Sequence, residues 1–165
     1  MRPPQLRLQS ITSMAAVNAF HSHLVLSAAS DRSLAVMDIN QSAVARHIPQ
    51  AQKKPIHAIR INEGSPFVSH GAGKPSLFSL SLCRLTATSG VEFYNMFATC
   101  AVSDGVALWD LRAEDCVRRY NGHVSRAHPV GMDISPCGRF LATGSEDRCC
   151  YVYDMRCGTS LGYCS

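Results

Sequence analysis

Cysteine and histidine have the widest chemical repertoire of the residues in this sequence, because both can bind metals and both take part in catalysis. The 165 residues include eight cysteines and seven histidines. No two cysteines have the C-x-x-C spacing of zinc and redox sites, and Cys149 and Cys150 would point to opposite faces of a strand. We therefore expect free thiols, no metal site, no cofactor and no catalytic residue.

A glycine-rich segment at residues 71–76, GAGKPS, resembles part of a phosphate-binding loop. The full motif would need glycine at position 68, which is Val68, and a hydroxyl residue at position 75, which is Pro75. Because Pro75 has no hydroxyl to bind magnesium, the segment does not predict nucleotide binding. This agrees with the expectation that the protein is not an enzyme.

The overall composition indicates a folded intracellular protein. Hydrophobic residues make up 46% of the chain and charged residues 17%, which is typical of a globular domain. The first residues, MRPP, are followed by no apolar signal-peptide segment, and no stretch approaches the length of a membrane span. We expect no membrane partner and an intracellular location, with the cytoplasm favoured over the nucleus.

Three segments of the chain look alike, at residues 30–38, 103–110 and 145–154. Each has a polar turn, a β-prone run, and a large side chain followed by aspartate. An apolar run rich in small residues precedes each segment, so each pair of runs predicts a β-hairpin. The closing aspartates lie 72 and then 44 residues apart. The surplus in the first interval falls almost entirely between residues 62 and 95.

This arithmetic predicts three four-stranded antiparallel units with one insert. The expected strands are 12–17, 23–29, 33–38 and 43–48 in the first unit, 56–61, 96–102, 105–110 and 116–120 in the second, and 130–134, 139–144, 149–154 and 159–163 in the third. We interpret the insert as an excursion introduced by alternative splicing, because the flanks align well without it. The alternation of Ser and Leu at 79–82 leaves an added edge strand open.

The third unit resembles a WD repeat. It has the Gly122-His123 opening, an S-P-x-G turn at 135–138, an S-x-D turn at 145–147, and the closing pair Tyr153-Asp154. The resemblance implies an all-β, partial WD-repeat β-propeller of about three blades, at 12–48, 56–120 with the insert at about 62–95, and 121–165. Propellers close with four to eight blades, so three blades would not close on their own.

The resemblance also implies a structural hydrogen-bond network. In the family, a His, an Asp, a Ser or Thr and a Trp bond to one another within a blade. The matching residues are His123, Thr143 and Asp147 in the third blade and Trp109, Thr99 and Asp104 in the second. Tyr153 replaces the tryptophan of the third blade, and no blade has all four members. We expect a direct bond between His123 and Asp147 that stabilises the blade.

The resemblance implies a non-enzymatic scaffold that binds other proteins, which could include the remaining blades of a longer propeller. Arg32, Arg126 and Arg148 fall in loops that lie, in the family, on the face that commonly binds peptides. They would suit acidic or phosphorylated peptides, or nucleic acid, and they could equally be solvated turn residues. The net charge of +4 is scattered and does not by itself imply nucleic acid.

The repeat arithmetic predicts that residues 71–93 are dispensable for folding of the last blade. Because loop-closure entropy changes by only about 0.6 kcal/mol per doubling of length, deleting them should stabilise the protein slightly. Urea unfolding of the deleted and parent proteins checks this. If the deleted protein unfolds at lower urea or loses solubility, the segment belongs to the core and our strand assignment for residues 56–110 is wrong.

Overall fold

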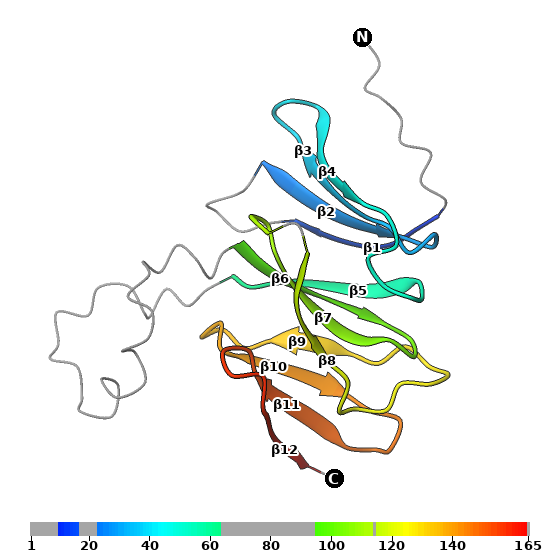
Figure 1. The fold of residues 1–165 in the computed structure, drawn as a ribbon, viewed down its shortest axis with the longest axis vertical. Helices are drawn as coiled ribbons and strands as arrows, with labels where there is room; N and C mark the ends of the chain where they lie inside the picture. The colour runs from blue at the N-terminus through cyan, green and yellow to red at the C-terminus, as the bar shows by residue number, and fades with distance from the viewer. Residues whose placement is uncertain (1–9, 17–22, 64–94, 114, 165) are drawn as a thin grey trace, which may run out of the picture.

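The computed structural model describes residues 10–16, 23–63, 95–113 and 115–164, which form three four-stranded antiparallel sheets (Figure 1). The strands are β1 Ile11–Ala16, β2 Leu24–Ala29, β3 Leu34–Asp38, β4 Ala43–Ile48, β5 Ile56–Ile61, β6 Met96–Ala101, β7 Gly105–Asp110, β8 Cys116–Tyr120, β9 Met132–Ile134, β10 Phe140–Gly144, β11 Cys150–Asp154 and β12 Ser160–Cys164. The strands expected from the sequence agree with these bounds to within one or two residues. The insert lies almost wholly outside the described residues. No helix within the described ranges is long and apolar enough to cross a membrane.

Each sheet is a simple meander, with its strands side by side in chain order. The sheets follow one another along the molecule (Figure 1). Their first strands lie next to one another, so that β5 packs against β1 on one side and β9 on the other. The fold is therefore all-β, with three blades that do not close into a ring.

The three sheets share a structural detail that repeats more regularly than the sequence does. The register between the third and fourth strands shifts at Met37, at Trp109 and at Tyr153. In each case the extra residue is on the fourth strand, at Ala45, Val117 or Leu161, beside the large side chain that precedes the closing aspartate. A bulge bends the strand and increases its twist, so all three outer edges are twisted at the same place.

The closing aspartates explain why the third strand ends where it does. The carboxylates of Asp38, Asp110 and Asp154 each accept a hydrogen bond from the backbone amide two residues further on, at 2.8–2.9 Å. This bond is an Asx turn, which reverses the chain into the outer strand. Asp154 also forms an ion pair with Arg139, with 2.7 Å between Oδ2 of Asp154 and Nη2 of Arg139. Burial alone would raise the pKa of Asp154, but hydrogen bonds from Arg139 and the turn amide lower it.

The hydrophobic core lies in two layers, one on each side of the second sheet. Successive residues of a strand point to opposite faces, so Phe97 packs toward the first sheet while Ala98 packs toward the third. Trp109 and Leu108 on β7 divide in the same way. The central strands of the second sheet are therefore apolar at almost every position, because neighbouring sheets cover both of their faces.

Candidate functional site

The sequence-predicted site residues gather mostly at one edge of the sheets, which we call the loop-and-turn edge. It consists of the hairpin turns β2–β3, β6–β7 and β10–β11, together with loops 49–55 and 121–131, which enter the second and third sheets. Hydrogen bonds join each entering loop to the hairpin turns of two adjacent sheets. The edge is therefore one connected surface across the blades.

Loop 49–55 lies between the turns of the first and second sheets. The amide of Ala51 donates to the carbonyl of Arg32 at 3.0 Å, and the amide of Lys53 donates to Oδ2 of Asp104 at 2.8 Å. The side chain of Asp104 is 7% exposed, and its Oδ2 also accepts a hydrogen bond from Nη1 of Arg119 at 3.0 Å. Asp104 thus ties the loop to its turn, which is the role that the family resemblance implies for a turn aspartate.

Gln52 is a buried polar side chain in the loop that enters the second sheet, as His123 is in the loop that enters the third, and the sequence comparison missed it. Its side chain is buried, and Nε2 donates to the carbonyl of Gly105 at 3.2 Å. Gln52 follows the preceding strand by four residues, and His123 follows its own by three. That similar spacing was the available signal, but glutamine does not belong to the Gly-His motif.

Loop 121–131 is held in the same way between the turns of the second and third sheets. Ser103 donates from its amide to the Ser125 carbonyl at 2.6 Å and from Oγ to the Arg126 carbonyl at 2.9 Å. On the other side, the amide of Val124 donates to Oγ of Ser145 at 2.9 Å. Both entering loops therefore bridge neighbouring sheets through their backbones.

In the second sheet, the expected tryptophan and threonine lie together. Nε1 of Trp109 donates to Oγ1 of Thr99 at 2.9 Å, and both residues are buried. Phe97 stacks against the indole, with 6.3 Å between the ring centroids. The bond satisfies the indole N–H, which would otherwise lose its hydrogen bond to water inside the core.

In the third sheet, the structure does not form the expected bond between His123 and Asp147. Nδ1 of His123 instead lies 3.3 Å from the hydroxyl of Tyr153, and Nε2 is buried with no hydrogen-bond partner among the described residues. The Tyr153 hydroxyl also bonds the backbone of Gly122 and His123. A phenol places its polar atom at the far end of the ring, so it reaches the loop where an indole would bond within the sheet.

Asp147 and Thr143 accordingly have other partners. Asp147 is exposed, accepts from the Tyr151 hydroxyl at 2.7 Å, and accepts from the Cys149 amide at 3.0 Å. Hydrogen bonds from Ser145 and Tyr151 lower the pKa of Asp147 to about 2. Oγ1 of Thr143 is 3.2 Å from the carbonyl of Gly131. The structure thus separates the three residues that the resemblance had grouped.

Glu146 contributes a contact that sequence comparison did not suggest. Its Oε1 accepts hydrogen bonds from three consecutive backbone amides, those of Arg126, Ala127 and His128, at 2.8, 2.7 and 2.7 Å. These amides lower the pKa of the Glu146 carboxyl. The position matches the variable residue of the S-x-D turn, so the motif gave no reason to select it.

Arg32, Arg126 and Arg148 all lie at the loop-and-turn edge and are exposed. Arg32 and Arg148 occupy equivalent places in the β2–β3 and β10–β11 turns, with φ angles of 73° and 70°. Arg126 lies in the loop beside the second of these turns. The structure therefore places all three cations on the same side of the sheets.

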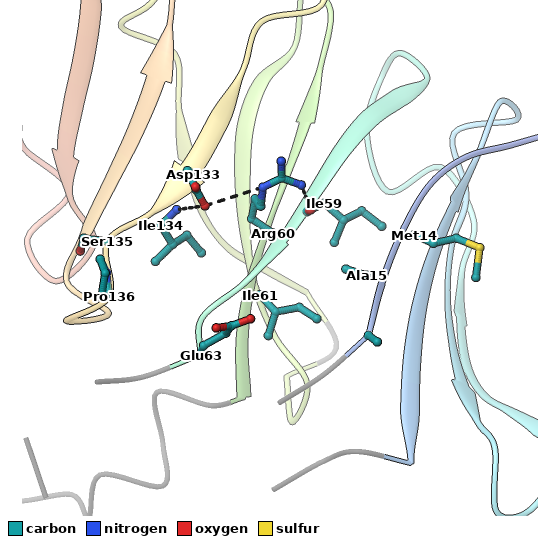
Figure 2. Close-up of a pocket in the computed structure, with 11 residues that line it drawn as sticks. Met14, Ala15, Ile59, Arg60, Ile61, Glu63, Asp133, Ile134, Ser135 and Pro136 are labelled. Carbon is teal, nitrogen blue, oxygen red and sulfur yellow. Dashed lines mark hydrogen bonds and ion pairs between the residues drawn. The ribbon is translucent and has the colours of Figure 1, made fainter. Parts of the chain in front are cut away.

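A separate hollow of about 610 Å³ lies along the first strands of the three sheets, β1, β5 and β9 (Figure 2). Two of its lining residues, Arg60 and Asp133, form an ion pair with 3.7 Å between Nε and Oδ1, and both side chains are largely exposed. Such surface pairs contribute little stability. The described residues hold no group of three His, Cys, Asp or Glu side chains placed to bind a metal ion.

Comparison with known proteins shows what kind of repeat this is. The family model for the WD domain, G-beta repeat, matches residues 114–154. The matched stretch is similar to a WD repeat. It covers β8 of the second sheet and β9, β10 and β11 of the third, so it spans two blades and contains loop 121–131.

Curated relatives contain similar stretches. The guanine nucleotide-binding protein subunit beta of Oryza sativa subsp. indica is 31% identical over 102 residues, which cover 61% of this chain and 26% of the relative. The same subunit of Zea mays is 40% identical over 68 residues, 41% of this chain and 17% of the relative. Protein groucho of Drosophila melanogaster is 36% identical over 78 residues, 40% of this chain and 10% of its own length. These matches span about a quarter or less of the relatives.

Solved structures share the fold. The crystal structure of RRP9 WD40 repeats and the structure of U3-55K each superpose with a TM-score of 0.68 at 14% identity. Each match covers 98% of this chain, and 40% or 41% of the solved chain. The three sheets therefore have the architecture of adjacent WD40 propeller blades.

The bond between His123 and Tyr153 predicts thermodynamic coupling. In a double-mutant cycle, His123→Ala and Tyr153→Phe should couple by about 1 kcal/mol, because each single change removes the same hydrogen bond. Urea unfolding of the two single variants and the double variant measures this. A cycle of His123→Ala with Asp147→Ala is the control and should give a smaller coupling energy. Equal couplings in the two cycles would contradict the geometry.

Burial of His123 predicts a pH dependence. Burial lowers the pKa of His123 below its ordinary value of 6.5, although the charge of Asp147 partly opposes this. The unfolded chain therefore binds this proton more tightly, and stability should fall as pH decreases through about 6.5. One proton limits the slope to about 1.4 kcal/mol per pH unit. Urea unfolding between pH 7.5 and 5.5 should show a shallower fall for His123→Gln. Equal slopes would mean that His123 titrates normally in the fold.

Proposed function

We propose that this protein is a non-enzymatic scaffold that binds other proteins through its WD-repeat blades. The observation that carries the proposal is the outer face of the third sheet. In the second sheet, Ala98, Val106 and Leu108 point toward the third sheet and are 0% exposed. They form part of a continuous core with the residues of the third sheet.

The third sheet presents a matching outer face. Thr99 and Thr143 occupy equivalent positions in the second and third sheets. With the two sheets aligned on these threonines, the positions of Ala98, Val106 and Leu108 correspond to those of Ala142, Cys150 and Val152. Cys150 is exposed, and Ala142 and Val152 are half-buried. An open hollow of about 230 Å³ lies over β9, β10 and β11 on this sheet. An apolar sheet face of this kind favours association with another protein surface.

The known relatives support a scaffold. The matched plant proteins are, by name, subunits of a guanine nucleotide-binding protein, and so belong to larger assemblies. The partner of the outer face would be a further four-stranded blade, from a longer propeller or from another protein. We also propose an intracellular location, with the cytoplasm favoured over the nucleus, because the exposed thiols Cys137, Cys150 and Cys157 would stay reduced inside the cell.

The outer face predicts that the chain alone self-associates or binds another β-rich chain. Light scattering should give a mass above that of a monomer, and a hydrophobic dye should bind. Val152→Lys should shift the protein toward the monomer, because a charge on this face opposes its burial. Val117→Lys is the matched control, since Val117 is 46% exposed on β8. A compact parent monomer without dye binding, or equal effects of the two lysines, would contradict the proposal.

A further inference from the structure

The three amides that bond Glu146 form a concave cluster of donors. Arg126, Ala127 and His128 are consecutive, and their N–H groups converge on one carboxylate oxygen at 2.7–2.8 Å. Successive backbone amides that point to a common centre are a well-established way to bind an anion. We call residues 126–128 the amide nest. In the structure, a side chain of the same chain fills it.

Contacts other than Glu146 hold the amide nest in shape. The Ser125 and Arg126 carbonyls accept bonds from Ser103, and the His128 carbonyl accepts from Oγ of Ser125 at 3.1 Å. In a trans peptide the N–H points away from the carbonyl of the preceding residue, so the bonds to the Ser125 and Arg126 carbonyls turn the amides of Arg126 and Ala127 the other way. The donors should therefore keep their direction when the carboxylate leaves.

The surroundings of the amide nest are cationic. Arg126 belongs to the nest, and Arg148 lies two residues after Glu146 in the adjacent turn; both are exposed, and neither bonds a described side chain. The His128 side chain is close enough to Glu146 to interact with its charge. The opposing charge is Asp147, whose carboxylate bonds Cys149 and Tyr151 instead of the loop.

We propose that the amide nest binds a phosphate monoester on a partner protein, and that Glu146 occupies the nest until the phosphate displaces it. The inference rests on the proposed scaffold function and names a ligand class for its loop-and-turn edge. Glu146 would then act as a built-in competitor that sets the threshold for binding.

Charge and tethering select the phosphate monoester among possible anions. Glu146 is tethered beside the nest, so a competing ligand must bind more strongly than a single carboxylate does. A phosphate monoester carries a charge of about −1.5 to −2 and three acceptor oxygens, whereas a carboxylate or a phosphodiester carries only about −1. Arg126 and Arg148 can add charge-assisted bonds to the extra oxygens. Glutamate-rich peptides and nucleic acid should therefore compete poorly.

The test is an amide-resolved NMR titration of the full chain with inorganic phosphate and with capped phosphoserine. The amide signals of residues 126–128 should shift in the parent. They should shift at about tenfold lower ligand concentration in Glu146→Ala, because the internal competitor is gone. Asp147→Ala is the matched control: it removes the same charge from the next residue but leaves the amide nest filled, so its titration should resemble that of the parent. Capped glutamate should shift these signals weakly in the parent.

Two results would overturn the inference. If Asp147→Ala tightens binding as much as Glu146→Ala does, the effect is general electrostatics and the amide nest is not the site. If phosphate leaves the amides of residues 126–128 unchanged in Glu146→Ala, the nest does not bind phosphate. Glu146→Gln covers the case in which the alanine variant unfolds, since it keeps the side-chain shape, and its shifts should also occur at lower phosphate than in the parent. Self-association through Val152 is measured separately, so the scaffold function can stand or fail independently.

Discussion

Each loop that enters a sheet is held between the hairpin turns of two neighbouring sheets, and the order of the blades depends on this constraint. The backbone of loop 49–55 bonds Arg32 on one side and Asp104 on the other. Loop 121–131 bonds Ser103 and Ser145 in the same way. Since each blade packs mainly through nondirectional apolar contacts, these directional bonds fix how one blade sits on the next.

The stacking of the blades also explains why the second and third sheets differ in how many of their faces are covered. The second sheet has a neighbour on each face, so Phe97 and Ala98, adjacent on one strand, both lie in hydrophobic cores. Small residues such as Ala98 and Ala107 let the sheets approach closely. The third sheet has the same pattern on its outer face, at Ala142 and Val152, and no other described strand packs there. The outer face of the third sheet therefore resembles the covered face of the second.

The strands follow from the sequence because each hairpin carries its own local signals, a polar turn and a closing aspartate. The side-chain bonds follow less well, since they depend on where a polar atom lies in space. Trp109 and Thr99 fit the family pattern and meet as expected. Tyr153 redirects His123 away from Asp147, because its hydroxyl extends to the loop. Substitution of one motif residue therefore changed the partners of the others.

The two entering loops also differ in how exchangeable their contacts are. The Asp104 side chain is only 7% exposed, and it holds both the Lys53 amide and Arg119, so it is shielded from ions in solution. Glu146 holds its loop from a solvent-exposed turn, and loop contacts to Ser103 remain without it. A ligand can replace only a contact that water and ions can reach. The loop of the third sheet is therefore the one whose holding carboxylate can exchange with an anion from outside, while the loop of the second sheet is fixed.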